Sequence, residues 1–202
     1  MNARGAEPRF FLDEGDPPSK QSILRAALGL FVKHGLAGTN VRMIGEAAGY
    51  TNPAMFKFFE SKDALALYLF ERCYERLYRR IEAAAGRRPF EAALGEVLGA
   101  FLGAMDDDLE AVLFVQDALR ELWPRLPAAA RKRSILRQLR ELLERGIREG
   151  AVTGYASSEV PVAALVGLVA QLGRMLYFGE VAGPARLRRA ELELALRRML
   201  KG

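Results

Sequence analysis

The sequence predicts an all-α protein with a helix-turn-helix DNA-binding domain near its N-terminus. Apolar residues recur three and four positions apart through most of the 202 residues, and no segment shows strand-like alternation. Glycines and prolines interrupt this pattern at helix-length intervals. Between Thr39 and Lys62, two short helical segments flank a glycine turn, which is the order of elements in a helix-turn-helix.

The helix-turn-helix follows from local residue choice. Apolar residues from Val41 to Ala48 recur at helical spacing, so this segment can bury one face. Gly49 then ends the helix, because glycine reaches positive φ without steric cost. Thr51 or Asn52 can cap the next helix, and Pro53 suits its first turn. The second helix of such a pair enters the major groove of DNA.

The charge of this region favours DNA as the partner. From Lys20 to Asp63, six basic residues stand against three acidic ones, a local charge of +3, and the whole chain carries +5. Neutralisation of phosphates supplies most of the sequence-independent affinity for DNA. Arg42, Lys57 and Lys62 lie in or at the start of predicted helices, where they can contact the DNA backbone.

Predicted helices continue to the end of the chain. Residues 1–18 are rich in glycine, proline and acids, and we expect a disordered tail there. A long helix after the helix-turn-helix places Leu65, Leu69 and Cys73 on one face. Outside the helix-turn-helix, the predicted helices span residues 19–34, 62–85, 90–105, 109–123, 127–149, 159–178 and 184–200.

The single cysteine and the single histidine argue against an enzyme. Cys73 lies in a strongly helical stretch, where we expect a small core residue rather than a redox sensor. His34 lies in the last turn of the first helix, and the sequence offers no second histidine for a metal site. The sequence also lacks a phosphate-binding glycine loop and a Ser/His/Asp set. We therefore expect no catalysis and no cofactor; a helical protein-interaction adaptor is the alternative to a DNA-binding regulator.

Two further features each allow two interpretations. Val160 to Phe178 is long enough to span a bilayer, but Gln171 and Arg174 interrupt it, so we expect a buried helix. No signal peptide is recognised, and a cytoplasmic protein is expected.

The outer face of residues 127–149 is basic, and we interpret it as a solvated face in preference to a second nucleic-acid surface. Its basic residues are Arg131, Lys132, Arg133, Arg137 and Arg140.

Part of the chain resembles the tetracycline-repressor (TetR) family of bacterial transcription regulators. The resemblance is specific from about Ile23 to Leu69 and begins with an amphipathic helix that ends in His34-Gly35. It continues with the motifs Thr39-x-Val41-Arg42-x-Ile44-x-x-Ala47-x-Gly49 and Pro53-x-Met55-Phe56-x-x-Phe59-x-Ser61-Lys62-Asp63-x-Leu65.

The resemblance implies about nine helices and two domains. Residues 19–64 would form the DNA-binding domain, and residues 65–202 a helical domain that binds a ligand and pairs with its copy in a homodimer. Carried over by position, Thr39, Asn40 and Arg42 would contact phosphates. The residues facing the major groove would be Thr51, Asn52, Pro53, Ala54 and Lys57, and those meeting the DNA backbone Phe56, Phe58 and Lys62.

Two positions depart from the family pattern. Family members commonly carry Tyr where this chain has Phe56, and His or Tyr where it has Phe58. A phenylalanine has no hydroxyl to donate to a phosphate. Met55 and Phe59 are expected to point inward, so Phe56 should point outward and pack on a sugar or a thymine methyl group.

The second half of the chain contains candidate pocket residues. Gly95, Gly99 and Gly103 stand four apart on one helix face, where each costs ~1 kcal/mol relative to Ala. They allow either close helix contact or room for a ligand. The other candidates can line an apolar cavity or form ordinary core. They are Phe101, Met105, Phe114, Trp123, Met175, Tyr177 and Phe178, with Gln116, Gln171 and Arg174 as polar anchors.

Small and apolar residues in the last two predicted helices suit a dimer interface. They are Ala163, Gly167 and Ala170, followed by Leu192 and Leu196. The predicted function is that of a transcriptional repressor that binds a palindromic DNA operator as a homodimer and is released by a small, largely apolar ligand. Two recognition helices must be held about one DNA turn, roughly 34 Å, apart to reach both half-sites.

Overall fold

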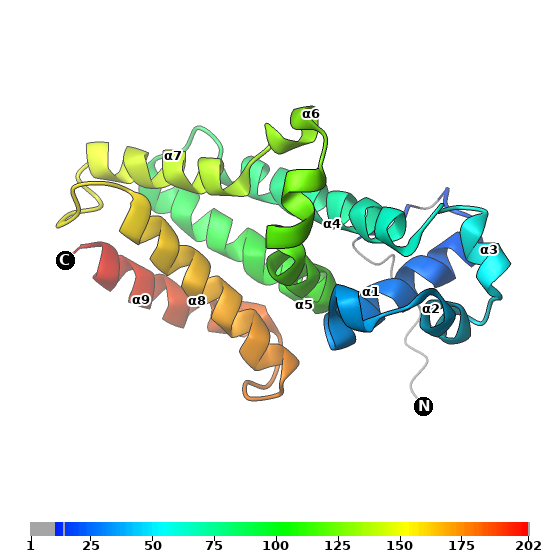
Figure 1. Cartoon of the computed structure of the whole chain (residues 1–202). Helices are drawn as coiled ribbons and strands as arrows, with labels where there is room; N and C mark the ends of the chain where they lie inside the picture. Colours follow the sequence, from blue (N-terminus) through cyan, green and yellow to red (C-terminus); the bar gives the residue numbers. More distant parts are fainter. Residues whose placement is uncertain (1–10, 14, 202) are drawn as a thin grey trace. The chain divides into compact units, whose positions relative to one another are not determined.

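A computed structural model describes residues 11–13 and 15–201, and the described part is all-helical, as predicted (Figure 1). The α-helices are α1 (Pro18–Gly38), α2 (Val41–Ala48), α3 (Asn52–Phe56), α4 (Lys62–Ala85), α5 (Phe90–Leu122), α6 (Ala128–Arg131), α7 (Ile135–Arg148), α8 (Glu159–Tyr177) and α9 (Arg189–Leu200). Two 3₁₀ turns, Trp123–Arg125 and Ala185–Arg188, complete the described elements. Because α3 and α6 are single turns, seven of the described helices have eight residues or more, slightly below the predicted nine.

The chain divides into two compact units. Unit 1 comprises Met1–Arg76 and Glu110–Arg131, and unit 2 comprises Leu77–Leu109 and Lys132–Gly202. Helices α4 and α5 each contribute residues to both units. The predicted functional division after residue 64 follows a different line and stays a prediction.

Unit 1 has an aromatic core. The ring of Phe114 stacks on Phe31, with centroids 5.7 Å apart, and meets the edge of Phe70 at 6.3 Å. Tyr74 lies against Trp123, with ring centroids 4.7 Å apart. Cys73 is fully buried, in agreement with the predicted core role.

The segment before α1 corrects the predicted disordered tail. Residues 1–10 and 14 lie outside the described part, but Phe11 and Leu12 are buried. Asp13 pairs with Arg72 and Arg76 of α4, and Arg72 also pairs with Asp16 at 3.3 Å. Two acids of this stretch, Asp13 and Asp16, are therefore paired with arginines distant in sequence, while two apolar side chains are removed from water.

Helix α5 is interrupted at an acidic run. The sequence predicts a break between residues 105 and 109, and Asp108 has non-helical dihedral angles (φ −158°, ψ 87°). Asp106 accepts hydrogen bonds from the backbone N–H groups of Ala185 and Arg186, the latter at 3.2 Å. A carboxylate at the start of a helical turn satisfies N–H groups that have no partner within that turn. This contact joins the end of the first half of α5 to the turn before α9.

The expectation of a buried helix after Val160 is not met within one chain. Helix α8 is long and apolar enough to cross a membrane by length and composition, which is weak evidence when it concerns one helix. Only 33% of its most apolar stretch is buried. Val160 near its start and Phe178 directly after its end are 62% and 71% exposed. An apolar helix left this open suggests a surface that a partner covers.

Candidate DNA-binding surface and effector region

Helix α2 ends at Gly49 as predicted, but Thr51, a predicted cap of α3, makes no side-chain cap hydrogen bond. The side chain of Asn40 caps α2, because its Oδ1 accepts the N–H of Met43 at 3.0 Å. Gly49 has a left-handed conformation with φ 73°, and the following N–H of Tyr50 donates to Gly45 O at 2.9 Å. This pattern closes the C-terminus of α2 and redirects the chain into α3.

Helix α3 has one inward and one outward face. Met55 and Phe59 are 1% and 6% exposed, whereas Phe56 is 51% exposed. The outward direction predicted for Phe56 is therefore confirmed. Thr51, Pro53 and Lys57 are also exposed, and Phe58 is partly buried. The predictions for the side chains of Asn52 and Ala54 lie outside what the structure describes.

Two predicted phosphate contacts are used inside the domain instead. Thr39 is 1% exposed, and its hydroxyl can donate to Gly35 O at 2.9 Å or to Leu30 O at 3.2 Å. The ammonium group of Lys62 donates to Leu36 O at 2.6 Å and to Thr39 O at 2.8 Å. A buried carbonyl needs a donor, so these two side chains hold the segment between α1 and α2 rather than a phosphate.

Arg42 remains at the surface. Its Nε donates to Glu46 Oε1 at 2.8 Å, and this hydrogen bond raises the pKa of Arg42 above its ordinary value. Both side chains are largely exposed, at 82% and 64%. Ion pairs this exposed contribute little to stability, so Arg42 can leave Glu46 for a phosphate at small cost.

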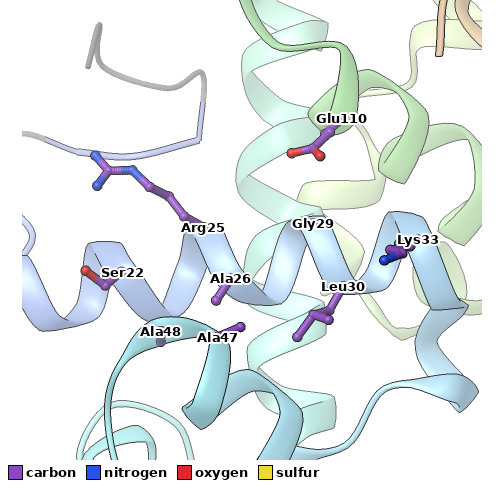
Figure 2. A pocket seen from close by; sticks show the side chains of 9 residues that line it. All are labelled: Ser22, Arg25, Ala26, Gly29, Leu30, Lys33, Ala47, Ala48 and Glu110. Atoms are coloured by element: carbon purple, nitrogen blue, oxygen red, sulfur yellow. The ribbon is translucent and has the colours of Figure 1, made fainter. Parts of the chain in front are cut away.

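A shallow groove of about 510 Å³ lies on unit 1 between α1 and α2 (Figure 2). Its floor is made of small residues, including Ala26, Gly29 and Ala47, and Glu110 points over Gly29. Arg25 and Lys33 stand on its rim. Because the acid opposes the two cations, this groove does not have the purely basic lining of a phosphate-binding surface.

The candidate pocket residues do not gather around one described cavity. Phe114 belongs to the core of unit 1, where Gln116 also lies with a buried Oε1 that has no described partner. Trp123 packs in unit 1 as well, while Phe101 and Met105 are buried in unit 2.

The candidates on α8 fall mainly on its exposed surface. Gln171 is exposed, and Tyr177 and Phe178 are 37% and 71% exposed. The prediction that these three line an interior pocket is wrong for the single chain. Residue 171 follows 163 and 167 at intervals of four, so it shares their outward helix face. Arg174 and Met175 are partly buried.

Two of the three glycines spaced four apart on α5 make room for side chains of α9. A Cβ atom placed on Gly99 would lie 2.9 Å from Arg189 Nη1. One placed on Gly95 would lie 3.3 Å from Glu193 Oε1. At Gly103 a Cβ would meet nothing within 4 Å. The structure thus supports close packing at the first two glycines and leaves space beside the third.

Some of the candidate dimer residues are exposed and others are buried. Ala163 and Gly167 of α8 are exposed, and Ala170 and Leu192 are partly buried. Leu196, however, is 0% exposed, so its predicted place at an interface is wrong for the folded chain. Between residues 185 and 200, the exposed leucines are Leu187 and Leu194, at 64% and 51%. Helical phase explains this correction, because Leu194 lies about 200° around α9 from Leu196.

The chain is similar to known proteins over one stretch of its sequence and over most of its fold. Residues 23–69 match the family described as bacterial regulatory proteins, tetR family. No curated protein sequence matches the chain significantly. Three similar solved structures cover nearly all of both chains, at identities that establish the fold alone.

The ketosteroid transcriptional regulator KstR2 of Mycobacterium tuberculosis is 16% identical with a TM-score of 0.79, covering 97% of this chain and 100% of its own. The TetR family transcriptional regulator PfmR from Thermus thermophilus is 20% identical, with a TM-score of 0.72 and coverages of 87% and 97%. The transcriptional regulator FadR from Bacillus subtilis, solved with stearoyl-CoA, is 14% identical, with a TM-score of 0.63 and coverages of 88% and 97%.

Proposed function

Because residues 23–69 match the tetR family of bacterial regulatory proteins, we propose that this chain is a member of that family and represses transcription as an operator-bound dimer. The family and its solved relatives are transcriptional regulators rather than enzymes. The observation that carries the proposal is the outward face of α3, where Phe56 and Lys57 are exposed while Met55 and Phe59 are buried. We place its activity in the cytoplasm, with the operator DNA.

Each exposed group of this face has a chemical role on DNA. Lys57 and Arg42 supply charge to phosphates, and Asn40 holds the start of α2 toward the backbone through its cap. Phe56 offers an apolar surface to a sugar or a thymine methyl. Base edges would be read by four residues at the start of α3: Thr51, Asn52, Pro53 and Ala54. Thr39 and Lys62 would position this set without touching DNA.

The dimer is proposed to form through the open face of α8. Ala163 and Gly167 allow close approach of a second helix, and the apolar side chain of Val160 would leave water on contact. Leu194 of α9 can extend this surface. A two-fold pair presents two recognition helices, which a palindromic operator requires.

The effector is proposed to be small and largely apolar. Among the similar structures, KstR2 is a ketosteroid transcriptional regulator and FadR from Bacillus subtilis was solved with stearoyl-CoA, and both names point to hydrophobic ligands in those proteins. In unit 2 of this chain, the candidates Phe101 and Met105 are buried, and Gly103 and Met175 are partly buried. A ligand would release DNA only if it binds the DNA-free conformation more tightly.

Selection of bound fragments from random duplexes, followed by titration of the recovered operator, tests this function. Lys57→Ala should weaken operator binding about tenfold, because a charge-assisted phosphate contact is lost. Lys201→Ala, an exposed lysine near the C-terminus, is the matched control and should bind normally. Failure to recover any enriched sequence would favour the protein-interaction adaptor instead.

A further inference from the structure

A second groove, in unit 2, has a lining that suits an anion. It has a volume of about 520 Å³ and lies between the last turns of α4 and the length of α7 from Arg137 to Arg145. Arg87, Lys132, Arg137 and Arg145 line it, against the two carboxylates of Glu82 and Glu141. The lining therefore carries a net positive charge in a concave site, where a field is stronger than on an open surface.

The cations of this groove are only partly used by the protein. Among the described residues, Arg87, Lys132 and Arg137 form no ion pair. Glu82, in contrast, is already occupied, because the hydroxyl of Tyr78 donates to its Oε1 at 2.8 Å. Burial together with this hydrogen bond raises the pKa of Tyr78. Three side-chain cations thus remain available to a ligand.

Two buried polar atoms at the groove also lack partners. The guanidinium of Arg145 donates to Gly86 O at 2.9 Å and to Ala85 O at 3.0 Å, which ties it to the end of α4. Its Nε is buried and has no partner in the described part of the chain. Gln138 Oε1 is also buried and also has no hydrogen-bond partner among the described residues. The first atom needs an acceptor and the second needs a donor.

The start of α7 adds a further attraction for an anion. Ser134 caps this 14-residue helix by accepting the N–H of Arg137 at 3.3 Å, and Ser134 itself lines the groove. The positive end of the helix dipole therefore faces the same space as the three free cations.

We propose that this groove binds a small phosphate ester that carries hydroxyl groups, such as a sugar phosphate or a nucleotide. Phosphate oxygens would accept from Lys132 and Arg137, with the guanidinium of Arg145 beside them. A sugar hydroxyl would donate to Gln138 Oε1. This site is separate from the DNA-reading face of α3 and from the apolar effector candidates in unit 2.

Calorimetric titration of the full chain with ribose 5-phosphate, ADP, inorganic pyrophosphate and ribose tests the site. The three phosphate probes should bind and ribose should not. The double variant Lys132→Gln/Arg137→Gln should bind them at least about tenfold more weakly, because two charge-assisted contacts are lost. Tighter binding of ADP than of ribose 5-phosphate would identify a nucleotide as the natural ligand, and the reverse order a sugar phosphate.

Two further variants separate this site from a general charge effect. Arg140→Gln removes an exposed arginine of α7 that does not line the groove and should leave binding unchanged. Gln138→Leu should bind ribose 5-phosphate more weakly than the parent chain does, because the sugar hydroxyl loses its acceptor, and should bind pyrophosphate as the parent does. Because Lys132 and Arg137 are exposed, the double variant should retain its melting temperature and its operator affinity.

Three results would overturn the proposal. They are no binding of any phosphate probe at millimolar concentration, an equal loss in Arg140→Gln, or a loss of duplex DNA binding in the double variant. The last result would make the basic face of α7 a second nucleic-acid surface. None of them bears on the operator-binding face, which Lys57→Ala tests separately.

Discussion

The helix-turn-helix of unit 1 and the helical layers of unit 2 are determined by contacts of different range. In the former, Asn40 caps through Met43, and Gly49 closes α2 onto carbonyls three and four residues back. In unit 2, Arg189 contacts Glu96 across 93 positions, and Asp106 reaches Ala185 across 79. A surface positioned by near neighbours can be predicted from spacing, whereas a pocket positioned by distant pairs cannot.

The largest effect on stability is expected in the segment before α1, where contacts with distant residues hold a stretch that the sequence predicts to be disordered. Phe11→Ala should lower the free energy of unfolding by about 3 kcal/mol, the lower end for truncating a buried phenylalanine. Denaturant unfolding measures it. Leu136→Ala, which truncates an exposed apolar residue, serves as the control. A variant as stable as the parent would mean that this segment is a tail after all.

The next effect concerns the connection that Lys62 makes within the DNA-binding domain. Lys62→Met should cost about 2 kcal/mol of unfolding free energy, because two carbonyls lose a charged donor. Operator affinity should fall as well, through misplacement of α2. The informative comparison is with Lys57→Ala, which should lose DNA affinity without losing stability. Equal stability of the two variants would return Lys62 to the list of direct phosphate contacts.

A glycine in unit 2 gives a smaller effect. A Cβ on Gly146 would lie 2.7 Å from Val152 and 2.8 Å from Phe90, so Gly146→Ala should destabilise by about 1–2 kcal/mol through overpacking. Gly103→Ala is the matched control, since a Cβ there meets nothing within 4 Å. Thermal unfolding under the same conditions compares them. A loss only in Gly103→Ala would show that the close contact lies at the other glycine.

The smallest expected change is at the tip of the recognition helix. Phe56→Tyr should strengthen operator binding about fivefold, because the added hydroxyl can donate to a phosphate while the exposed ring keeps its position. Fluorescence anisotropy with a labelled operator resolves such a difference. Unchanged or weaker binding would show that the ring of Phe56 does not lie beside the backbone.

The helical fold, the turn at Gly49 and the outward direction of Phe56 were predictable, because helical spacing and capping are local. The internal roles of Thr39 and Lys62 were not, since the carbonyls they serve belong to α1 and its following loop. A signal existed in hindsight: a threonine directly before a helix cap is well placed to bond the preceding turn.

The candidate pocket and interface residues were harder to place for a second physical reason. Apolar residues on α8 look alike whether they face the core, a ligand or a partner chain. Only helical phase separates exposed Gln171 from buried Leu172, or exposed Leu194 from buried Leu196. That phase depends on which neighbour each helix packs against, and the sequence alone leaves this choice open.

In the proposed complex, two chains together hold two recognition helices in one operator. Sedimentation of the chain with its selected palindromic duplex, and with a duplex carrying one half-site, measures this directly. We expect two chains on the palindrome and binding to the half-site weaker by at least about a hundredfold, since the second contact is lost. One chain per duplex, with equal affinity for both DNAs, would contradict the account.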